Sequence, residues 1–221
     1  MTNFDPRLYL ILDPAQRPTD KLIDLTREAV AGGVTLLQLR CKSLSTCRFL
    51  ETAQAVKVAL ADTEVPLLIN DRIDIALAVG AAGVHIGQDD LPVADARRLL
   101  GEQAIIGLTV RSPEEAAAAS LELLDYVSIG GVFATTSKQN STAPIGLDGL
   151  QAITDQLHQR QSNLPLTAIA GIDRSNAAEV IAAGVDGIAV ISAITAAADP
   201  GNTAAELRRT VDTALTQRSK S

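Results

Sequence analysis

Polar side chains follow the second apolar segment of this chain at a spacing that suits anion binding. Gln38, Arg40 and Lys42 alternate with Leu39 and Cys41 in the sequence QLRCK. Alternate side chains of an extended segment share one face, so the amide and the two cations should point together. A guanidinium offers paired donors to phosphate oxygens and an ammonium adds a compact charge. The segment therefore indicates an anion site, with an exposed and solvated strand end as the alternative.

Two carboxylates follow the next two apolar segments. Asn70 and Asp71 come directly after residues 65–69, and Asp90 follows residues 83–86 within HIGQDD. Mg²⁺ prefers one or two carboxylates together with phosphate oxygens and water. Beside a basic anion site, the pair predicts Mg²⁺ bridging a diphosphate; the alternative for each aspartate alone is a helix cap. His85, inside the fourth apolar segment, is expected to be structural.

Later segment ends offer a second place for phosphate. A hydroxyl-rich loop with one lysine comprises Thr135, Thr136, Ser137 and Lys138. Gly171 follows the seventh apolar segment, and Ile191 and Ser192 follow the eighth and should begin a short helix. Backbone N–H groups near the last two strands of a barrel commonly bind phosphate. An ordinary polar loop, and turn or cap roles for the glycine, are the alternatives.

Eight short apolar segments, each followed by a helical pattern, must position these residues. Strands are expected at 7–12, 34–39, 65–69, 83–86, 104–108, 126–130, 164–170 and 187–191. Helices are expected at about 19–32, 45–61, 72–80, 93–99, 112–122, 147–160, 175–183 and 202–217. The alternation predicts an α/β fold, a single (β/α)8 TIM barrel with its active site at the carboxyl ends of the strands. An open Rossmann-like sheet is the alternative, but no GxGxxG follows the first strand.

A recurring glycine marks the passage from helix to strand. AGGV, AAGV and AAGV place Gly33, Gly83 and Gly184 before apolar runs. Glycine at this point is expected to end a helix in a left-handed conformation.

Length, composition and charge limit the classes of function. The 221 residues are 47% hydrophobic and contain no linker-like stretch, so one domain spanning 1–221 is expected, with a core of about 7–217 and a loose tail at 218–221. A net charge of −7 argues against nucleic-acid binding. The apolar run near the N-terminus is too short for a membrane span or signal peptide, so no membrane association is expected. Two cysteines without metal-type spacing suit a reducing, cytoplasmic location. A homo-oligomer is left open.

The ordered set QLRCK, ND, HIGQDD, TTSK, AGI and ISAI resembles the thiamine phosphate synthase family across roughly residues 7–195. The resemblance implies a TIM barrel that joins hydroxymethylpyrimidine diphosphate to a thiazole phosphate, or its carboxylated form, and releases diphosphate with the help of Mg²⁺. It assigns the pyrimidine diphosphate to Gln38, Leu39, Arg40, Cys41, Lys42, Asn70, Thr109 and Lys138. It assigns Mg²⁺ to Asp71 and Asp90, and the thiazole phosphate to Thr135, Thr136, Ser137, Gly171, Ile191 and Ser192. Arg40, Lys42 and Lys138 would stabilise the leaving diphosphate.

Departures from the family pattern are visible at four positions. Cys41 stands where an acidic residue is common, Thr109 where serine is common, and Ala134 where proline is common. Ala170 replaces the first glycine of a frequent Gly-Gly pair. Thr109 keeps the hydroxyl, whereas Ala134 and Ala170 bear on loop rigidity and the shape of the thiazole site.

Two other functions stay open on the sequence alone. A thiazole tautomerase of the same barrel family would be expected to use a histidine after the fifth strand, where this chain has Thr109-Val110-Arg111. A non-catalytic regulator that binds a thiamine precursor is the other. Retention of the charged set argues against it.

Overall fold

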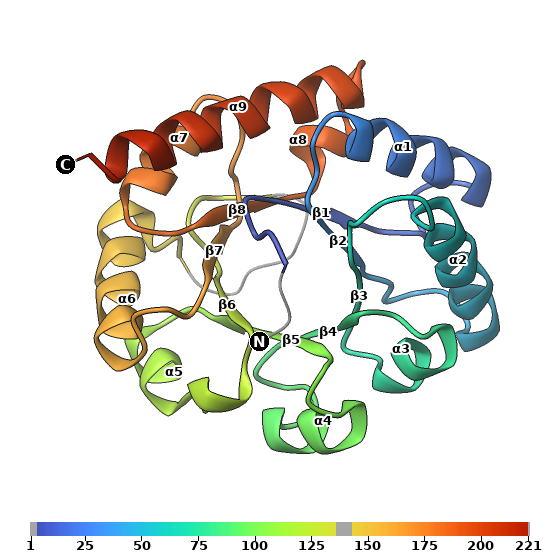
Figure 1. The fold of residues 1–221 in the computed structure, drawn as a ribbon, viewed down its shortest axis with the longest axis horizontal. Helices are drawn as coiled ribbons and strands as arrows, with labels where there is room; N and C mark the ends of the chain where they lie inside the picture. The colour runs from blue at the N-terminus through green and yellow to red at the C-terminus, as the bar shows by residue number, and fades with distance from the viewer. Residues whose placement is uncertain (1–3, 136–142, 221) are drawn as a thin grey trace.

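Eight parallel strands form a closed barrel in the computed structural model, which describes residues 4–135 and 143–220. The strands pair in sequence order and the barrel closes where β1 pairs with β8 (Figure 1). They are β1 (Leu8–Leu12), β2 (Leu36–Leu39), β3 (Leu67–Asn70), β4 (Gly83–Ile86), β5 (Ile105–Val110), β6 (Tyr126–Ile129), β7 (Leu166–Ile169) and β8 (Gly187–Val190). The predicted TIM barrel is therefore confirmed.

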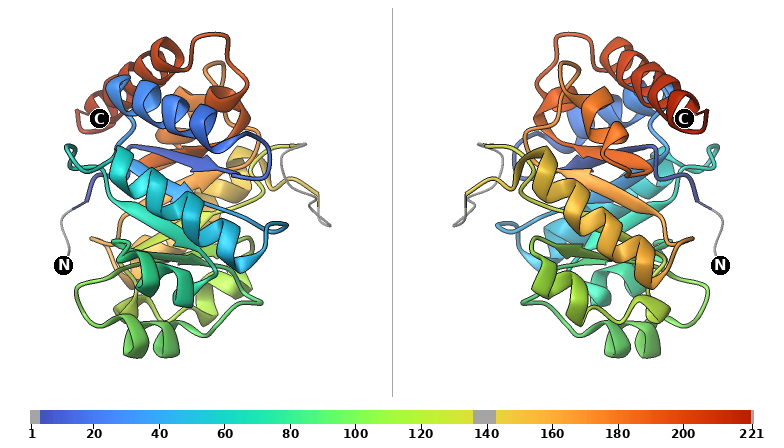
Figure 2. Two further views of the ribbon diagram at one scale, coloured as in Figure 1. Left: turned by 90° about the vertical axis from the view of Figure 1, so that its right-hand side faces the viewer. Right: turned by 90° about the vertical axis from the view of Figure 1, so that its left-hand side faces the viewer.

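The helices form a ring outside the strands (Figure 1). They are α1 (Thr19–Ala31), α2 (Thr46–Ala59), α3 (Ile73–Val79), α4 (Val93–Leu100), α5 (Pro113–Ala118), α6 (Gly146–Arg160), α7 (Ala177–Ala182), α8 (Ser192–Thr195) and α9 (Pro200–Arg218), with a 3₁₀ turn η1 (Leu121–Leu123). In side view, residues 4–7 before β1 lie at one end of the barrel, and residues 130–135 after β6 lie toward the other (Figure 2). The short helix expected after β8 is α8.

Alternation along the strands separates two hydrophobic cores. Outward-facing strand residues such as Leu37, Leu39 and Val127 pack against the helices in the larger core. The barrel interior holds a smaller cluster that includes Tyr9, Leu36 and Tyr126. Successive residues of a strand point to opposite faces of the sheet. Each strand is buried on both faces, so it contributes to the core outside the barrel and to the core inside it.

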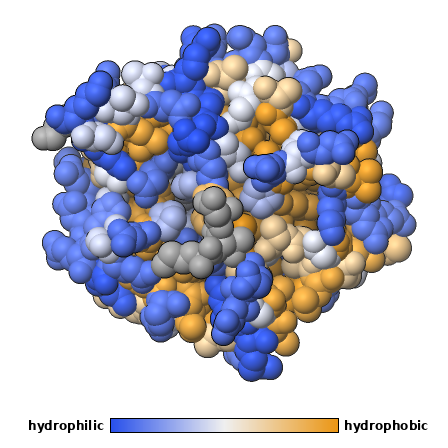
Figure 3. Space-filling model, viewed as in Figure 1, coloured by the Kyte–Doolittle hydropathy of each residue, from blue (hydrophilic) through white to orange (hydrophobic). Residues whose placement is uncertain are grey.

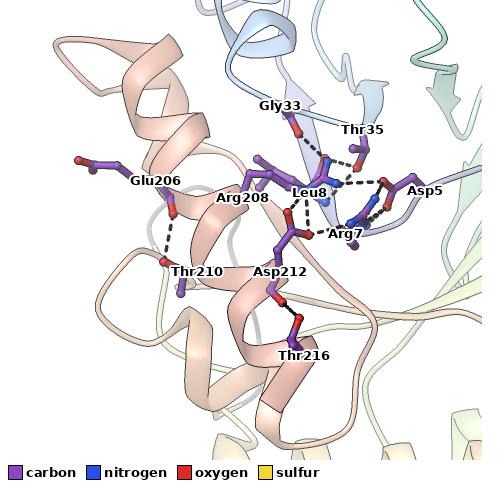
Figure 4. A network of polar contacts seen from close by, with 10 residues as sticks. All are labelled: Asp5, Arg7, Leu8, Gly33, Thr35, Glu206, Arg208, Thr210, Asp212 and Thr216. Carbon is purple, nitrogen blue, oxygen red and sulfur yellow. Dashed lines mark hydrogen bonds and ion pairs between the residues drawn. The ribbon is translucent and has the colours of Figure 1, made fainter. Parts of the chain in front are cut away.

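An ion-pair network at the amino end of the barrel ties the start of β1 to α9 (Figure 4). Arg7 pairs with Asp5 at 2.6 Å and with Asp212 at 2.8 Å. Arg208 pairs with the same two carboxylates at 3.5 and 2.9 Å. Both arginines therefore have their charge balanced by carboxylates of the same chain.

The C-terminal helix continues one residue into the expected tail. Arg218 is the last residue of α9 and donates to the carbonyls of Ile181 and Val185 and to Asp186, the last two at 2.6 and 2.8 Å. These contacts hold the helix end against α7 and the start of β8, so the helix ends one residue beyond the expected boundary at 217.

Helix endings follow the predicted glycine rule in two of three places. Gly33 and Gly184 have φ of 104° and 106°. In the AAGV at 81–84, however, α3 ends three residues earlier, at Gly80 with φ 64°. Gly83 lies inside β4, where a Cβ would come within 1.8 Å of the Ile105 carbonyl oxygen. Its role is close strand packing, which corrects the expected helix-ending role.

One predicted helix is divided. Residues 112–122 were expected to form one helix, but α5 ends at Ala118 and η1 follows. Arg160 of α6 donates to the carbonyls of Ala116 and Ala119, the latter at 2.8 Å. Those carbonyls would accept amide hydrogens if the helix continued, so the arginine favours the break.

The outer surface is mixed in character. Hydrophilic residues cover much of the face in Figure 3, with hydrophobic residues showing between them. Val58 and Leu77 are the most exposed large hydrophobic residues described, at 72% and 54%. Among the described residues, none of the helices combines the length and apolar character that crossing a bilayer requires.

Candidate active site

A cavity of about 550 Å³ opens at the carboxyl ends of the strands. Its walls come from every strand or from the residues that follow it. The polar side chains that line it are Gln38, Arg40, Asn70, His85, Thr109, Arg111, Thr135, Asp173 and Ser192. Apolar lining comes mainly from β1, β7 and β8. A concave site with few polar groups on an apolar base is typical of small-molecule binding.

The alternation predicted after β2 is present. Gln38 and Arg40 line the cavity, whereas Leu39 is buried in the outer core and Cys41 packs against that core. Leu39 and Cys41 therefore offer the cavity only their main-chain groups, which restricts their predicted role in diphosphate binding. The guanidinium of Arg40 forms no ion pair with any residue that the structure describes. An unpaired cation lining a cavity favours an anionic ligand.

Lys42 lies on the rim rather than in the cavity wall. Its side chain is 56% exposed and its ammonium pairs with the carboxylate of Asp71. Lys42 follows β2 in the sequence, and its side chain reaches the predicted metal ligand after β3. The pair joins the predicted diphosphate and metal groups at one edge of the mouth.

Asp71 and Asp90 form a close carboxylate pair. Burial, then the hydrogen bond shared with Asp90, raises the pKa of Asp71. Burial also opposes ionisation of Asp90, but the hydrogen bond from Asp71 and the Gly87 amide, which donates at 2.7 Å, together lower its pKa. The two pKa values are therefore shifted in opposite directions, so that Asp71 takes up a proton before Asp90 does as pH falls. Two adjacent carboxylates at a cavity rim are costly unless a cation lies between them.

The backbone holds Asp71 in an uncommon conformation. Its φ is 62°, in the left-handed region, and its amide donates to the carbonyl of His85 at 2.9 Å. This conformation turns the side chain from the end of β3 toward the end of β4. Aspartate tolerates it better than most residues.

A polar network beneath the cavity was missed by the sequence analysis. Gln38 donates to the hydroxyl of Tyr9, which lies 2.9 Å from the hydroxyl of Tyr126. His85 joins this network to the cavity: its Nδ1 is 2.7 Å from Tyr126 and its Nε2 is 2.7 Å from the hydroxyl of Thr109. His85 also lines the cavity, so a purely structural role is an incomplete description. The inward position of His85 between outward Val84 and Ile86 was the available signal.

The opposite side of the cavity is shaped by backbone turns after β7 and β8. Gly171 has φ 65°, and a Cβ there would lie 2.5 Å from the carbonyl oxygen of Ala134. Only glycine fits this approach. Ala170 has φ 99°, a conformation in which a side chain is strained. Ile191 and Ser192 line the cavity at the start of α8.

The structure brings most of the predicted site together at one mouth. The predicted residues that line the cavity are Gln38, Arg40, Asn70, Thr109, Thr135, Gly171, Ile191 and Ser192, whereas Lys42, Asp71 and Asp90 are not part of its wall. Thr136, Ser137 and Lys138 lie outside the described residues. Arg111 is an addition: it lines the cavity, and none of the described residues forms an ion pair with its guanidinium. The run Thr109-Val110-Arg111 at the end of β5 places it on the same face as Thr109.

Comparison with known proteins agrees with this geometry. The sequence model of a family described as thiamine monophosphate synthase matches residues 8–194. The chain belongs to the thiamine monophosphate synthase family. A thiamine-phosphate synthase of Agrobacterium fabrum is 45% identical over 218 residues, covering 99% of each chain. Another from Albidiferax ferrireducens is 46% identical and covers 93% of this chain and 92% of its own.

A solved structure of a related protein has the same fold as this chain. The thiamine phosphate pyrophosphorylase of Pyrococcus furiosus superposes with a TM-score of 0.82 at 37% identity, covering 95% of this chain and 96% of its own. Membership of the thiamine monophosphate synthase family confirms the resemblance, and it favours neither the tautomerase nor the regulator. The assignment of individual site residues stays a prediction.

Proposed function

We propose that this chain condenses 4-amino-2-methyl-5-hydroxymethylpyrimidine diphosphate with hydroxyethylthiazole phosphate, or its carboxylated form, to give thiamine phosphate and diphosphate. The observation that carries the proposal is one cavity with two different anion-binding sides. Two arginines without an ion-pair partner among the described residues and a carboxylate pair flank one side, and a tight glycine turn with Ser192 forms the other. Family membership supplies the reaction class.

The diphosphate would be held on the side of β2 to β5. Arg40 provides paired donors, and Asn70 and Thr109 add neutral donors within the cavity. Lys42 and Lys138 would add positive charge, and Gln38 lies deeper, where the pyrimidine ring would lie. The predicted role of Lys138 rests on the sequence alone.

Asp71 and Asp90 fit a magnesium ion. Their carboxylates share a hydrogen bond, and the raised pKa of Asp71 reflects burial and the neighbouring charge that a divalent cation would relieve. Hard oxygen ligands and room for phosphate oxygens suit Mg²⁺. When bound, the ion would supply charge neutralisation for the diphosphate. No cluster of three or more histidine, cysteine or acidic side chains that could hold a metal occurs among the described residues, so the proposal rests on this pair of carboxylates.

The thiazole phosphate would be held by the β6 to β8 side. Thr135, Gly171, Ile191 and Ser192 surround that part of the cavity. The close approach that Gly171 permits brings main-chain groups near the phosphate. Thr136 and Ser137 belong to the same predicted set on sequence grounds.

The reaction then needs charge stabilisation and positioning. The bond between the pyrimidine methylene carbon and the diphosphate oxygen breaks, and its electron pair leaves with diphosphate. Arg40, Lys42 and Lys138 stabilise the charge that develops on that oxygen. The amino-pyrimidine delocalises the positive charge left on the methylene carbon, and the thiazole nitrogen donates its lone pair to form the new carbon–nitrogen bond. Holding both substrates in one cavity makes this step effectively intramolecular.

Direct assay of the purified protein tests this proposal. With both substrates and Mg²⁺, diphosphate and thiamine phosphate should form together. Arg40→Gln should lower turnover by about 10²-fold or more, on the scale of losing one charge stabiliser, whereas Arg27→Gln on the exposed face of α1 should leave it unchanged. Absence of product would contradict the enzyme.

Two results would identify the other functions. Tight binding of the pyrimidine diphosphate without turnover would instead indicate the regulator. Interconversion of thiazole carboxylate isomers alone would indicate the tautomerase. A cytoplasmic location and a homo-oligomer stay predictions.

A further inference from the structure

Five side chains form a continuous series of hydrogen bonds that crosses the barrel interior beneath the cavity, from Gln38 to Thr109. Gln38 Nε2 donates to Tyr9 Oη, and Tyr9 Oη lies 2.9 Å from Tyr126 Oη. Tyr126 Oη lies 2.7 Å from His85 Nδ1, and His85 Nε2 lies 2.7 Å from Thr109 Oγ1. Gln38, Tyr9 and Tyr126 are at most 1% exposed, and His85 is 7% exposed. Water is thus largely excluded as an alternative partner along this chain.

The number of hydrogens that each group carries decides which atom donates in each of these hydrogen bonds. The Gln38 amide nitrogen can only donate, so Tyr9 accepts from it and must place its own hydrogen on Tyr126. Tyr126 in turn donates to His85 Nδ1, which must be unprotonated. The ring hydrogen of His85 then lies on Nε2 and is donated to Thr109. Thr109 accepts there, so its hydroxyl hydrogen remains to be donated elsewhere.

We propose that this network is a one-way relay of hydrogen-bond orientation, in which Gln38, Tyr9 and Tyr126 fix the Nε2–H tautomer of His85 and so turn the Thr109 hydroxyl hydrogen toward the cavity. Thr109 lines the cavity, and its hydroxyl contacts no other partner among the described residues. Tyr9 and Tyr126 act as positioning residues, because neither lines the cavity and they reach it only through Gln38 and His85.

The relay suits an anionic ligand at Thr109, an identification that rests on the proposed function. In the direction set by Gln38, the hydroxyl offers a hydrogen to a diphosphate oxygen. In the opposite direction Thr109 would donate to His85 Nε2 and present only lone pairs to the cavity. An anion would then meet repulsion at a position where it could have gained a charge-assisted bond.

Packing holds the relay in place. A Cβ at Gly107 would lie 2.0 Å from Tyr126 Cζ, so the missing side chain on β5 gives the tyrosine ring room to cross the interior. Tyr9 and Tyr126 also meet edge to face at 5.9 Å between ring centroids. Burial raises the pKa of both hydroxyls, which keeps their hydrogens in the network.

Nitrogen NMR of the histidine rings measures the central element of the relay. The chain has two histidines, His85 and His158, so ¹⁵N-histidine labelling gives a simple spectrum with His158 on α6 as an internal reference. In the ligand-free wild type, His85 should be the Nε2–H tautomer. Finding the Nδ1–H tautomer or the imidazolium would overturn the relay.

A near-isosteric substitution tests whether the direction is set from the buried end. Glutamate at position 38 presents an ionised carboxylate, which can only accept. In Gln38→Glu every hydrogen bond of the relay should reverse its direction, and His85 should become the Nδ1–H tautomer. Retention of Nε2–H in the folded variant would contradict control by Gln38. If that variant does not fold, Tyr9→Phe serves instead, because cutting the chain should give a mixture of tautomers and a single unchanged tautomer would refute the relay.

Ligand binding tests the consequence at Thr109. Calorimetry with inorganic diphosphate and Mg²⁺ should show about tenfold weaker binding for Thr109→Val, whose shape is similar but which has no hydroxyl, and near-normal binding for Thr109→Ser. Equal binding by Thr109→Val and wild type would overturn the donor role. The two proposals fail separately, since the tautomer is measured on free protein. Turnover with the opposite tautomer would refute only the relay, and the expected tautomer without turnover would refute only the proposed reaction.

Discussion

Asparagine in place of Asp71 should stabilise the metal-free protein and remove most of its activity. Asp71 is largely buried beside Asp90, and both burial and that neighbour raise its pKa. Asparagine has nearly the same shape, carries no charge, can still donate to Asp90, and tolerates the φ of 62°. The variant therefore removes the cost of a partly buried charge without adding backbone strain, while it loses one of the two carboxylates proposed to bind Mg²⁺.

The size of the gain follows from two opposing contributions. The ion pair with Lys42 is lost, but the lysine is 56% exposed, so this costs about 0.5 kcal/mol. Removing an unfavourable charge from a functional site commonly gains about 0.5–2 kcal/mol. The net expectation is about 1 kcal/mol in the free energy of unfolding, or about 2–4 °C in Tm for a chain of this length.

The pH dependence has a definite sign. Because the folded protein binds the Asp71 proton more tightly than the unfolded chain does, ionisation of Asp71 opposes folding as pH rises through the unfolded value of about 4. The advantage of Asp71→Asn should therefore be complete at about pH 7 and absent well below pH 4, where the carboxyl is protonated in both states. Urea titrations in EDTA at the two pH values measure it.

Asp90→Asn is the matched variant and should behave oppositely. The pKa of Asp90 is lowered, so its carboxylate stabilises the fold above the unfolded value of about 4, and this contribution is lost as pH falls through the folded pKa. Asp90→Asn should be less stable than wild type at about pH 7. Destabilisation by Asp71→Asn at that pH, or shifts of the same sign in both variants, would refute the opposite pKa shifts of the two carboxylates.

Three further substitutions test other parts of the site. Gly107→Ala should lower the free energy of unfolding by about 3 kcal/mol, measured in urea, because the new Cβ would lie 2.0 Å from the Tyr126 ring; a cost below about 1 kcal/mol would contradict the close fit. Ala170→Gly should raise it by about 0.5 kcal/mol, since relief of strain at φ 99° exceeds the added entropy of the unfolded chain, and a loss of stability would contradict that strain. Arg111→Gln should raise KM for at least one phosphorylated substrate about tenfold while Arg27→Gln does not; steady-state kinetics with unchanged constants would remove Arg111 from the site.

The barrel was predictable because its signal is local. Each apolar run and each helix start or end depends on a few neighbouring residues, so the eight repeats were recognisable. The error at Gly83 is instructive. A glycine before an apolar run is equally suited to ending a helix and to close strand packing, and the Ile105 carbonyl that decides between them belongs to the next strand.

Part of the site was predictable for the same reason. Alternation along the strand placed Gln38 and Arg40 on the cavity side, because side chains two residues apart point to the same face. The network beneath the cavity was not predictable in this way. Tyr9 and Tyr126 are 117 residues apart and meet only because the barrel closes. The positive φ of Ala170 likewise follows from the turn after β7, and an alanine in the sequence does not predict such a conformation.

The two ends of the barrel differ in how their charges are satisfied, and this difference points to the ligand. At the amino end, Arg7 and Arg208 each pair with both Asp5 and Asp212. At the carboxyl end, the guanidiniums of Arg40 and Arg111 line a cavity and pair with no described carboxylate. The chain has 26 acidic residues against 19 lysines and arginines, so acidic partners are abundant. Because neither arginine has an ion-pair partner among the described residues, we expect both to face the place where negative charge arrives with a substrate.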